Sequence, residues 1–141
     1  MSLKSWIHAL TAPNTISKLD FKTSKEIKLV LLVNHELKMG KGKIAAQVGH
    51  ASVKAALNAS ARHPDLMQGW LNNGQPKVVL KVQKTAELEQ IIELAKENNL
   101  EINTIRDAGK TQIPPNSLTV VAIGPDFSEK INVVSKDLKL L

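Results

Sequence analysis

Four short apolar runs along the chain have the length and residue composition of buried β-strands. They occupy residues 27–33 (IKLVLLV), 77–82 (KVVLKV), 101–107 (EINTIRD) and 118–124 (LTVVAIG). The first run is almost continuously apolar, which is typical of a strand that is covered on both faces. The pattern therefore predicts four strands.

The segments that separate these runs predict helices. The first helix should end near Pro64, because proline does not continue a helix, and Asp65 is a suitable N-cap for the second. The residues NNG at 72–74 should end that second helix, and Thr85 should cap the third. The predicted helices span residues 44–62, 66–71, 86–99 and 128–138.

Alternating strands and helices predict an α/β fold, with a sheet that has helices on both faces. The last two strands are joined by only about ten residues without a helix, so they should be antiparallel and the sheet mixed. A chain of 141 residues is most simply one domain. We expect a single three-layer domain with a four-stranded mixed sheet over residues 25–141, and an N-terminal extension over residues 1–24. A targeting segment or a remnant of cloning remains an alternative for those first residues.

Composition and charge limit the classes of function that fit this chain. The formal charge is +6 and the pI about 9.6, which favours an anionic partner. Aromatic residues make up only 3% of the chain, which argues against stacking bases on a sheet. There is no cysteine, so disulfides, thiolate metal sites and a cysteine nucleophile are excluded and a reducing compartment, the cytoplasm, is expected. The histidines lack the spacing of zinc ligands, and no apolar run reaches the length of a membrane span.

The stretch LKMGKGKIAAQVGH, residues 37–50, leads a flexible basic loop into a helix. Helix N-termini attract anions, and the Gly-Lys-Gly-Lys sequence adds positive charge there. A solvated helix face is the alternative reading, and the glycines favour the anion site. The stretch lacks the Walker P-loop pattern, and its partial match to a dinucleotide fingerprint has no acid after the second strand. One helix face should carry Lys43, Gln47, His50 and Lys54, and the opposite side, facing the sheet, Ile44, Val48, Ala51, Ala55 and Leu57.

A second polar loop, RDAGKTQIPPNS at 106–117, follows the third predicted strand. Asp107 stands at the end of that strand, where α/β folds place functional groups. Lys110, Thr111 and Gln112 add a cation, a hydroxyl and an amide. The alternative is that Asp107 only caps the turn. There is no G-x-S-x-G elbow, so serine-hydrolase chemistry is not supported.

Five segments together resemble the type 2 peptidyl-tRNA hydrolases of archaea and eukaryotes. They are LKMGKGKIAAQVGHA, GQPKVVLKV, DAGKTQIPPNS, TVVAIGP and the final DLKLL, and the resemblance runs from about residue 27 to residue 141. It implies a single α/β domain, usually dimeric. It also implies hydrolysis of the ester between a peptide and the 3′ end of tRNA, without a metal or cofactor and without a membrane.

The resemblance also implies roles for individual residues. Lys43, Asp107 and Thr111 match positions that the family is proposed to use in catalysis, with Asp107 as the group that activates water and Lys43 as the group that stabilises the oxyanion. The residues expected to bind substrate are Lys38, Lys41, Gln47, His50, Lys54, Lys110 and Thr119. A non-catalytic RNA-binding or protein-interaction module on the same fold is the alternative function.

The chain departs from the family pattern in two places. The first strand is followed by Asn34, His35 and Glu36 where relatives usually have a basic residue. One tRNA contact is therefore expected to be missing or replaced by His35. The usual Pro-Gly-Ser reads Pro-Asn-Ser, with Asn116. Asparagine tolerates a positive φ better than most residues, so we expect the turn to survive.

Overall fold

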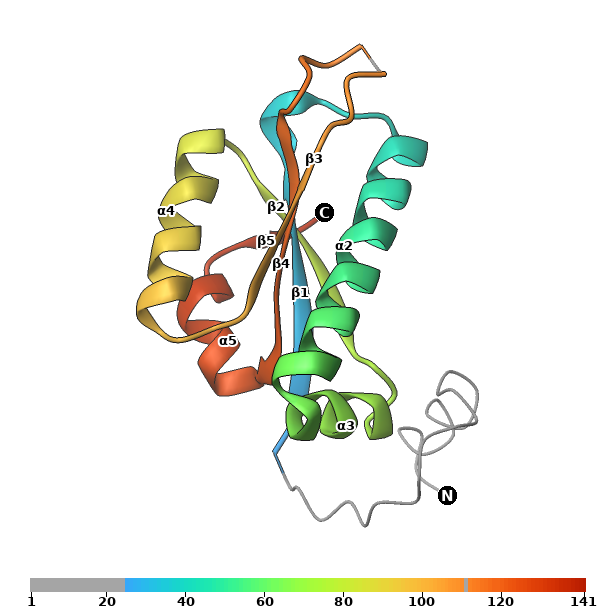
Figure 1. The fold of residues 1–141 in the computed structure, drawn as a ribbon. Coiled ribbons are helices and arrows are strands. Elements are labelled where there is room, and N and C mark those ends of the chain that lie inside the picture. The colour runs from blue at the N-terminus through green and yellow to red at the C-terminus, as the bar shows by residue number, and fades with distance from the viewer. Residues whose placement is uncertain (1–24, 111) are drawn as a thin grey trace.

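The computed structural model describes residues 25–110 and 112–141 (Figure 1). The elements are β1 (Ile27–Asn34), the short 3-10 helix η1 (His35–Leu37), α2 (Lys41–Arg62), α3 (Pro64–Asn72), β2 (Lys77–Val82), α4 (Thr85–Glu97), β3 (Ile102–Arg106), β4 (Leu118–Phe127), α5 (Ser128–Ser135) and β5 (Lys139–Leu140). Strands and helices alternate for most of the chain, but β3 is followed directly by β4.

The strands form one mixed sheet in the order β3-β4-β1-β2-β5. β1 pairs in parallel with β2, whereas β4 is antiparallel to both β1 and β3. The predicted mixed sheet and the predicted antiparallel pairing of the last two long strands are therefore confirmed. The predicted number of four strands is wrong, because β5 adds a fifth at the edge beside β2. That strand has only two residues, too few to give a recognisable pattern in the sequence.

Helices cover both faces of the sheet, as predicted (Figure 1). Successive residues of β1 point to opposite faces, so each face receives its own set of apolar side chains. On the α4 and α5 side the core includes Val30, Leu32, Leu88, Ile91 and Ile131, and on the α2 and α3 side it includes Leu29, Leu31, Val33, Ala51, Ala55 and Trp70. Both cores are buried, which explains why β1 is apolar almost throughout.

Helix starts differ from the predictions because other groups occupy the caps. α3 begins at Pro64 with His63 at the N-cap, so Asp65 lies inside the first turn. α4 begins at Thr85, which is therefore the first helical residue and not the cap. The backbone N–H of Thr85 instead donates to Oε2 of Glu36 at 2.7 Å. A carboxylate from a distant segment thus satisfies this free donor of the α4 N-terminus.

Helix α2 begins at Lys41, three residues before the predicted start, and lies off-centre on its face of the sheet. It packs against β4, β3 and β1 and has little contact with β2. The expected burial of Ala51 and Ala55 is confirmed, but the prediction for Leu57 is wrong, because that side chain is 67% exposed. The helix is rotated so that its buried stripe passes through Gln47.

The carboxyl ends of β1, β2 and β3 meet at one end of the sheet, where α2 and α4 begin (Figure 1). We call this the carboxyl end of the sheet. The loop between β3 and β4 lies there, so the two polar stretches singled out in the sequence come to the same end of the molecule (Figure 1). Ligands of open α/β sheets bind at such an end.

Candidate active site

Lys43 and Asp107 form an ion pair at the carboxyl end of the sheet. Nζ of Lys43, in the first turn of α2, lies 2.5 Å from Oδ1 of Asp107, which directly follows β3. The Asp107 side chain is 1% exposed and the Lys43 side chain 22% exposed. A buried carboxylate needs a partner, and here the partner is a cation that still reaches the surface.

Backbone hydrogen bonds of the second loop hold Asp107 in place. The N–H of Gly109 donates to Oδ2 of Asp107 at 2.8 Å, and Gly109 has a φ of 84°. The backbone N–H of Asp107 donates to the carbonyl of Ser117, and the N–H of Asn116 donates to the carbonyl of Asp107. Asp107 therefore caps the turn, which was the alternative interpretation, and also binds Lys43.

Asn116 adopts the conformation expected of it. Its φ is 66°, in the left-handed region where asparagine costs less than most residues, so the expectation that the turn survives is confirmed. Its carbonyl oxygen accepts a hydrogen bond from Nη1 of Arg106 at 3.0 Å. The turn thereby also fixes the backbone beside Asp107.

Gln47 and Thr119 form a buried polar contact about one helical turn from Lys43. Nε2 of Gln47 donates to Oγ1 of Thr119 at 2.9 Å, and this hydroxyl donates to the carbonyl of Ile105 at 3.0 Å. Gln47 is 8% exposed and Thr119 is 0% exposed. The structure therefore places Thr119 behind Gln47, in contact with that side chain.

The predicted polar stripe of α2 divides into two groups. Lys43 and Gln47 point to the site, whereas Lys54 lies about three turns, roughly 16 Å, further along the helix. There its Nζ donates to the carbonyl of Thr104 at 2.9 Å. His50 is exposed on the helix surface. The structure thus brings neither Lys54 nor His50 to the Lys43–Asp107 pair.

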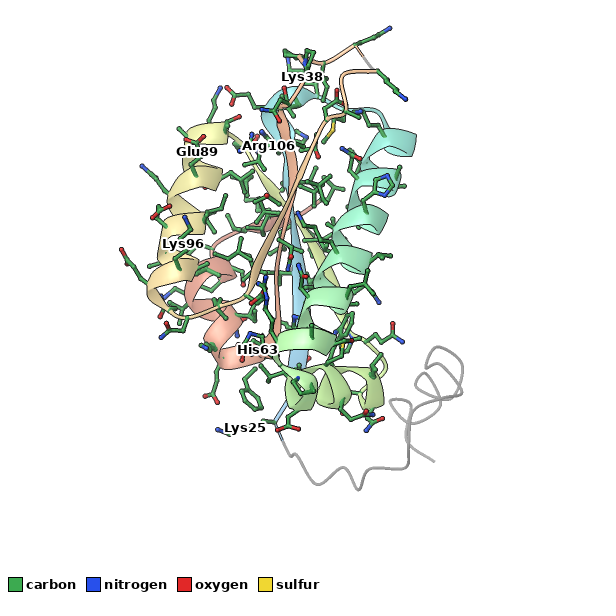
Figure 2. All side chains as sticks on the ribbon, in the orientation of Figure 1. Lys25, Lys38, His63, Glu89, Lys96 and Arg106 are labelled. Atoms are coloured by element: carbon green, nitrogen blue, oxygen red, sulfur yellow. The ribbon has the colours of Figure 1, made fainter. Side chains whose placement is uncertain are left out.

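Exposed cations surround the pair at the carboxyl end of the sheet. Lys38, Lys41 and Lys110, which the sequence proposed as phosphate ligands, are all exposed. Arg106 is also exposed and lies in the same half of the molecule as Lys38 in Figure 2. Sequence reasoning missed Arg106, although its place directly before Asp107 could have indicated it. Thr111 lies outside the described residues.

Asn34, one of the departures from the family pattern, has a structural role. It is 1% exposed, and its Nδ2 donates to Oγ1 of Thr85 and to the carbonyl of Leu118, both at 2.9 Å. Its Oδ1 accepts from the N–H of Glu36. Asn34 therefore ties β1 to α4 and β4 and does not reach a ligand. His35 next to it is exposed, and its Nδ1 lies 3.3 Å from Oε1 of Gln83.

The described part of the chain lacks two other kinds of site. Among residues 25–110 and 112–141, no group of three or more histidine or acidic side chains has the arrangement to hold a metal ion. None of the helices that the structure describes has both the length and the apolarity to span a bilayer. The side chains at the carboxyl end of the sheet include a carboxylate, a paired ammonium group and several exposed cations.

Comparison with known proteins identifies the family. The family model of peptidyl-tRNA hydrolase PTH2 matches residues 27–141. A peptidyl-tRNA hydrolase of Methanococcus maripaludis strain C7 is 50% identical over 111 residues, 79% of this chain and 96% of the relative. That of Methanocaldococcus jannaschii is 46% identical over 115 residues, 82% of this chain and 100% of the relative. The mitochondrial peptidyl-tRNA hydrolase 2 of Bos taurus is 45% identical over 117 residues, 83% of this chain and 65% of the relative. The chain therefore belongs to the PTH2 family of peptidyl-tRNA hydrolases.

Proposed function

We propose that this protein hydrolyses the ester bond between the peptide and the 3′ end of tRNA in peptidyl-tRNA, and does so with Lys43 and Asp107. The observation that carries the assignment of residues is the 2.5 Å ion pair between them, which joins a helix N-terminus to a strand end within a basic surface. The reaction recycles tRNA from peptide chains that are released prematurely, before their synthesis is complete. Membership in the PTH2 family supports the activity.

Hydrolysis of this bond needs only modest catalytic assistance, because an ester is more reactive than an amide. Asp107 orients a water molecule and accepts its proton while the water oxygen attacks the ester carbonyl carbon. Lys43 stabilises the oxyanion that develops on the carbonyl oxygen, close to the positive end of the α2 dipole. The bond from the carbonyl carbon to the ribose oxygen then breaks, and that oxygen takes up the proton that Asp107 accepted.

Thr111 completes the proposed catalytic set. We place its hydroxyl as a donor to the substrate or as a relay for the proton, because it follows Asp107 in the same loop. Gln47 and Thr119 hold the wall of the site between α2 and β3. No step in this scheme uses a metal ion or an organic cofactor.

The decisive experiment replaces Asp107 by asparagine, which keeps the shape and removes the charge. We expect kcat for release of peptide from peptidyl-tRNA to fall by about 10²–10⁴-fold, the usual contribution of general acid–base catalysis. Asp126→Asn is a matched control, because Asp126 is also buried and paired with a lysine, Lys130, but lies near the opposite end of β4. Circular dichroism establishes that both variants fold.

Turnover close to normal in a folded Asp107→Asn variant would refute the role of this residue. Peptide release that is absent in the wild type, with tRNA binding retained, would favour the alternative of a non-catalytic RNA-binding module. Free aminoacyl-tRNA serves as the second substrate and tells whether the enzyme requires a blocked amine.

We propose further that Lys38, Lys41 and Lys110 bind tRNA phosphates, supported by their exposure at the carboxyl end. We assign residues 25–141 to the hydrolase domain and residues 1–24 to an N-terminal extension. A homodimer is proposed from the family resemblance and is tested by sedimentation. A cytoplasmic location is proposed from the lack of cysteine, and imaging of a fluorescent fusion tests it against an organellar one.

A further inference from the structure

An apolar groove lies beside α2, on the part of the sheet face that this helix leaves uncovered. Because α2 packs over β4, β3 and β1, a hollow of about 690 Å³ remains between the helix and the β2 edge. Its apolar lining consists of Ile44, Ala45, Val48, Val79, Leu140 and Leu141. This volume lies within the range of about 300–1,000 Å³ that is usual for ligand sites.

The two sides of α2 differ in chemistry. The side toward β3 is closed by polar contacts, among them Lys43 with Asp107 and Lys54 with Thr104. The side toward β2 carries apolar groups that remain open to solvent, since Leu140 is 69% exposed and Leu141 50% exposed. Exposed apolar side chains that cluster around a groove are typical of a surface that binds a ligand or another protein.

The groove wall already holds an extended segment of this chain. Leu140 of β5 pairs with Leu80 of β2, and the N–H of Leu141 donates to the carbonyl of Val79 at 3.1 Å. One wall of the groove is therefore itself an extended segment with leucine side chains. Backbone pairing along a sheet edge, with pockets for side chains, is a common way to bind peptides.

One end of the groove opens next to the candidate active site. Lys41 lines its mouth, and Ile44 follows Lys43 directly in the first turns of α2. A Cβ added at Gly40 or Gly42 would meet no atom within 4 Å, so bare surface surrounds the helix start between groove and ion pair. A chain whose end is held at Lys43 can therefore cross to the groove.

We propose that this groove binds the peptide portion of peptidyl-tRNA, as an extended segment with apolar side chains. The proposal rests on the proposed function. The tRNA portion needs cations, and the lining offers only Lys41 at the mouth, so the apolar hollow suits the peptide. A second hollow of about 350 Å³ follows on the same side of α2; its lining includes Ser52, Ala56 and Trp70 and one cation, Lys77.

The geometry sets the length of peptide that should matter. Ala56 lies about 18 Å beyond Ile44 along the helix axis. An extended chain rises about 3.3 Å per residue, so this distance corresponds to about five residues. Contacts between the peptide and the groove should therefore increase in number up to about five residues from the ester. Residues beyond that should add no further contact.

The test compares kcat/KM for N-acetylated peptidyl-tRNAs that carry one, three, five and eight residues of alternating leucine and alanine. We expect kcat/KM to rise at least about tenfold from one residue to five, equivalent to about 1.4 kcal/mol, and to level off beyond. Serine–asparagine peptides of the same lengths should show no such rise.

Two variants of α2 test the position of the groove. The ratio of kcat/KM for the five-residue substrate to kcat/KM for the one-residue substrate should fall at least about threefold in Ala45→Gln. It should stay at the wild-type value in Ala46→Gln. Both positions are exposed on α2, but only Ala45 lines the groove.

Release that is equally fast for all lengths overturns the groove assignment and leaves the hydrolase function intact. Absence of release from every substrate instead means that the proposed function fails. Sedimentation of the same variants tests a second copy as the occupant. A changed oligomeric state of Ala45→Gln, with equally slowed release of short and long peptides, would overturn the peptide assignment.

Discussion

The side-chain amide of Gln47 donates a hydrogen bond to the hydroxyl of Thr119, and this hydroxyl donates in turn to the carbonyl of Ile105. The chain of two bonds connects α2 to β4 and β3 in a fully buried position. It therefore fixes the spacing between the helix that carries Lys43 and the strand that ends before Asp107.

Thr119→Val should weaken both stability and turnover. Valine keeps the volume but removes the hydroxyl, so the buried amide of Gln47 loses its acceptor, at a cost of about 1–3 kcal/mol. A shift of α2 against β3 should also lower kcat, by about tenfold, because the positions of Lys43 and Asp107 depend on it. Urea unfolding and single-turnover kinetics measure the two effects.

Thr119→Ser keeps a hydroxyl at this position, so its stability and its kcat should both be close to those of the wild type. If valine changed stability but left kcat at the wild-type value, Thr119 would have no positioning role in the reaction.

Binding of tRNA should depend on salt through the lysines at the carboxyl end. Replacing Lys38 or Lys110 by alanine should lower affinity and reduce the slope of log K against log salt by about 0.7–0.9 for each phosphate that is no longer neutralised. Filter binding of tRNA at several salt concentrations gives the slope. The effect should not depend on the tRNA sequence, because phosphates are the same in all of them.

Lys54→Ala serves as the comparison for this series. Nζ of Lys54 donates to the carbonyl of Thr104, away from the carboxyl end. Its removal should therefore change the salt slope by less than half of the change seen for Lys38. An equal change in both would mean that tRNA extends along α2, in agreement with the sequence prediction.

Acid should weaken the contact between Glu36 and α4. The backbone N–H of Thr85 donates to the Glu36 carboxylate, and this bond is the largest cause of its lowered pKa. A carboxyl group whose pKa is lower in the folded state stabilises the fold above its unfolded pKa of about 4.3, and this contribution disappears as the pH falls through the folded pKa.

The matching measurement compares wild type with Glu36→Gln by thermal unfolding from pH 7 to pH 2.5. The wild type should be the more stable at pH 7, and the difference should diminish below about pH 4, as the carboxylate takes up its proton. A difference that stayed constant over this range would contradict a role for the charge.

Gly124→Ala should destabilise the protein by more than about 1 kcal/mol. Gly124 has a φ of 106°, and a Cβ there would lie 3.0 Å from the carbonyl oxygen of Lys28. Gly49→Ala is the control, since Gly49 lies inside α2 with no atom near its added Cβ, and alanine there should stabilise by about 0.5–1 kcal/mol. Equal effects of the two substitutions in urea unfolding would argue against this account.

The long apolar strands were predictable because burial on both faces leaves a strong pattern. Residues 27–33 and 77–82 agree with β1 and β2 almost to the residue. β5 could not be predicted, since two residues at an edge are paired by tertiary contacts alone. The start of α4 was misplaced by one residue because its cap comes from Glu36, a residue far away in the sequence.

The site was predictable in its ion pair and less so in its surroundings. Lys43 stood out because it follows the first polar loop at a helix start, and Asp107 because it begins the second polar loop at a strand end. The structure joins the two side chains. The burial of Gln47 depends on the rotation of α2, which an alanine-rich helix hardly specifies, because alanines pack almost equally well on several faces. The same scarcity of large side chains explains why Leu57 was placed on the wrong side.

The described chain begins at Lys25, at the end of the sheet opposite to Lys38 and Arg106 (Figure 2). Residues added before this point join the fold far from the carboxyl end of the sheet. Evolution can therefore lengthen or replace the beginning of the chain, for delivery to another compartment or for tethering, without rebuilding catalysis. Leu140 and Leu141, by contrast, line the groove. A tag or surface attachment for kinetic work belongs at the first residues for the same reason.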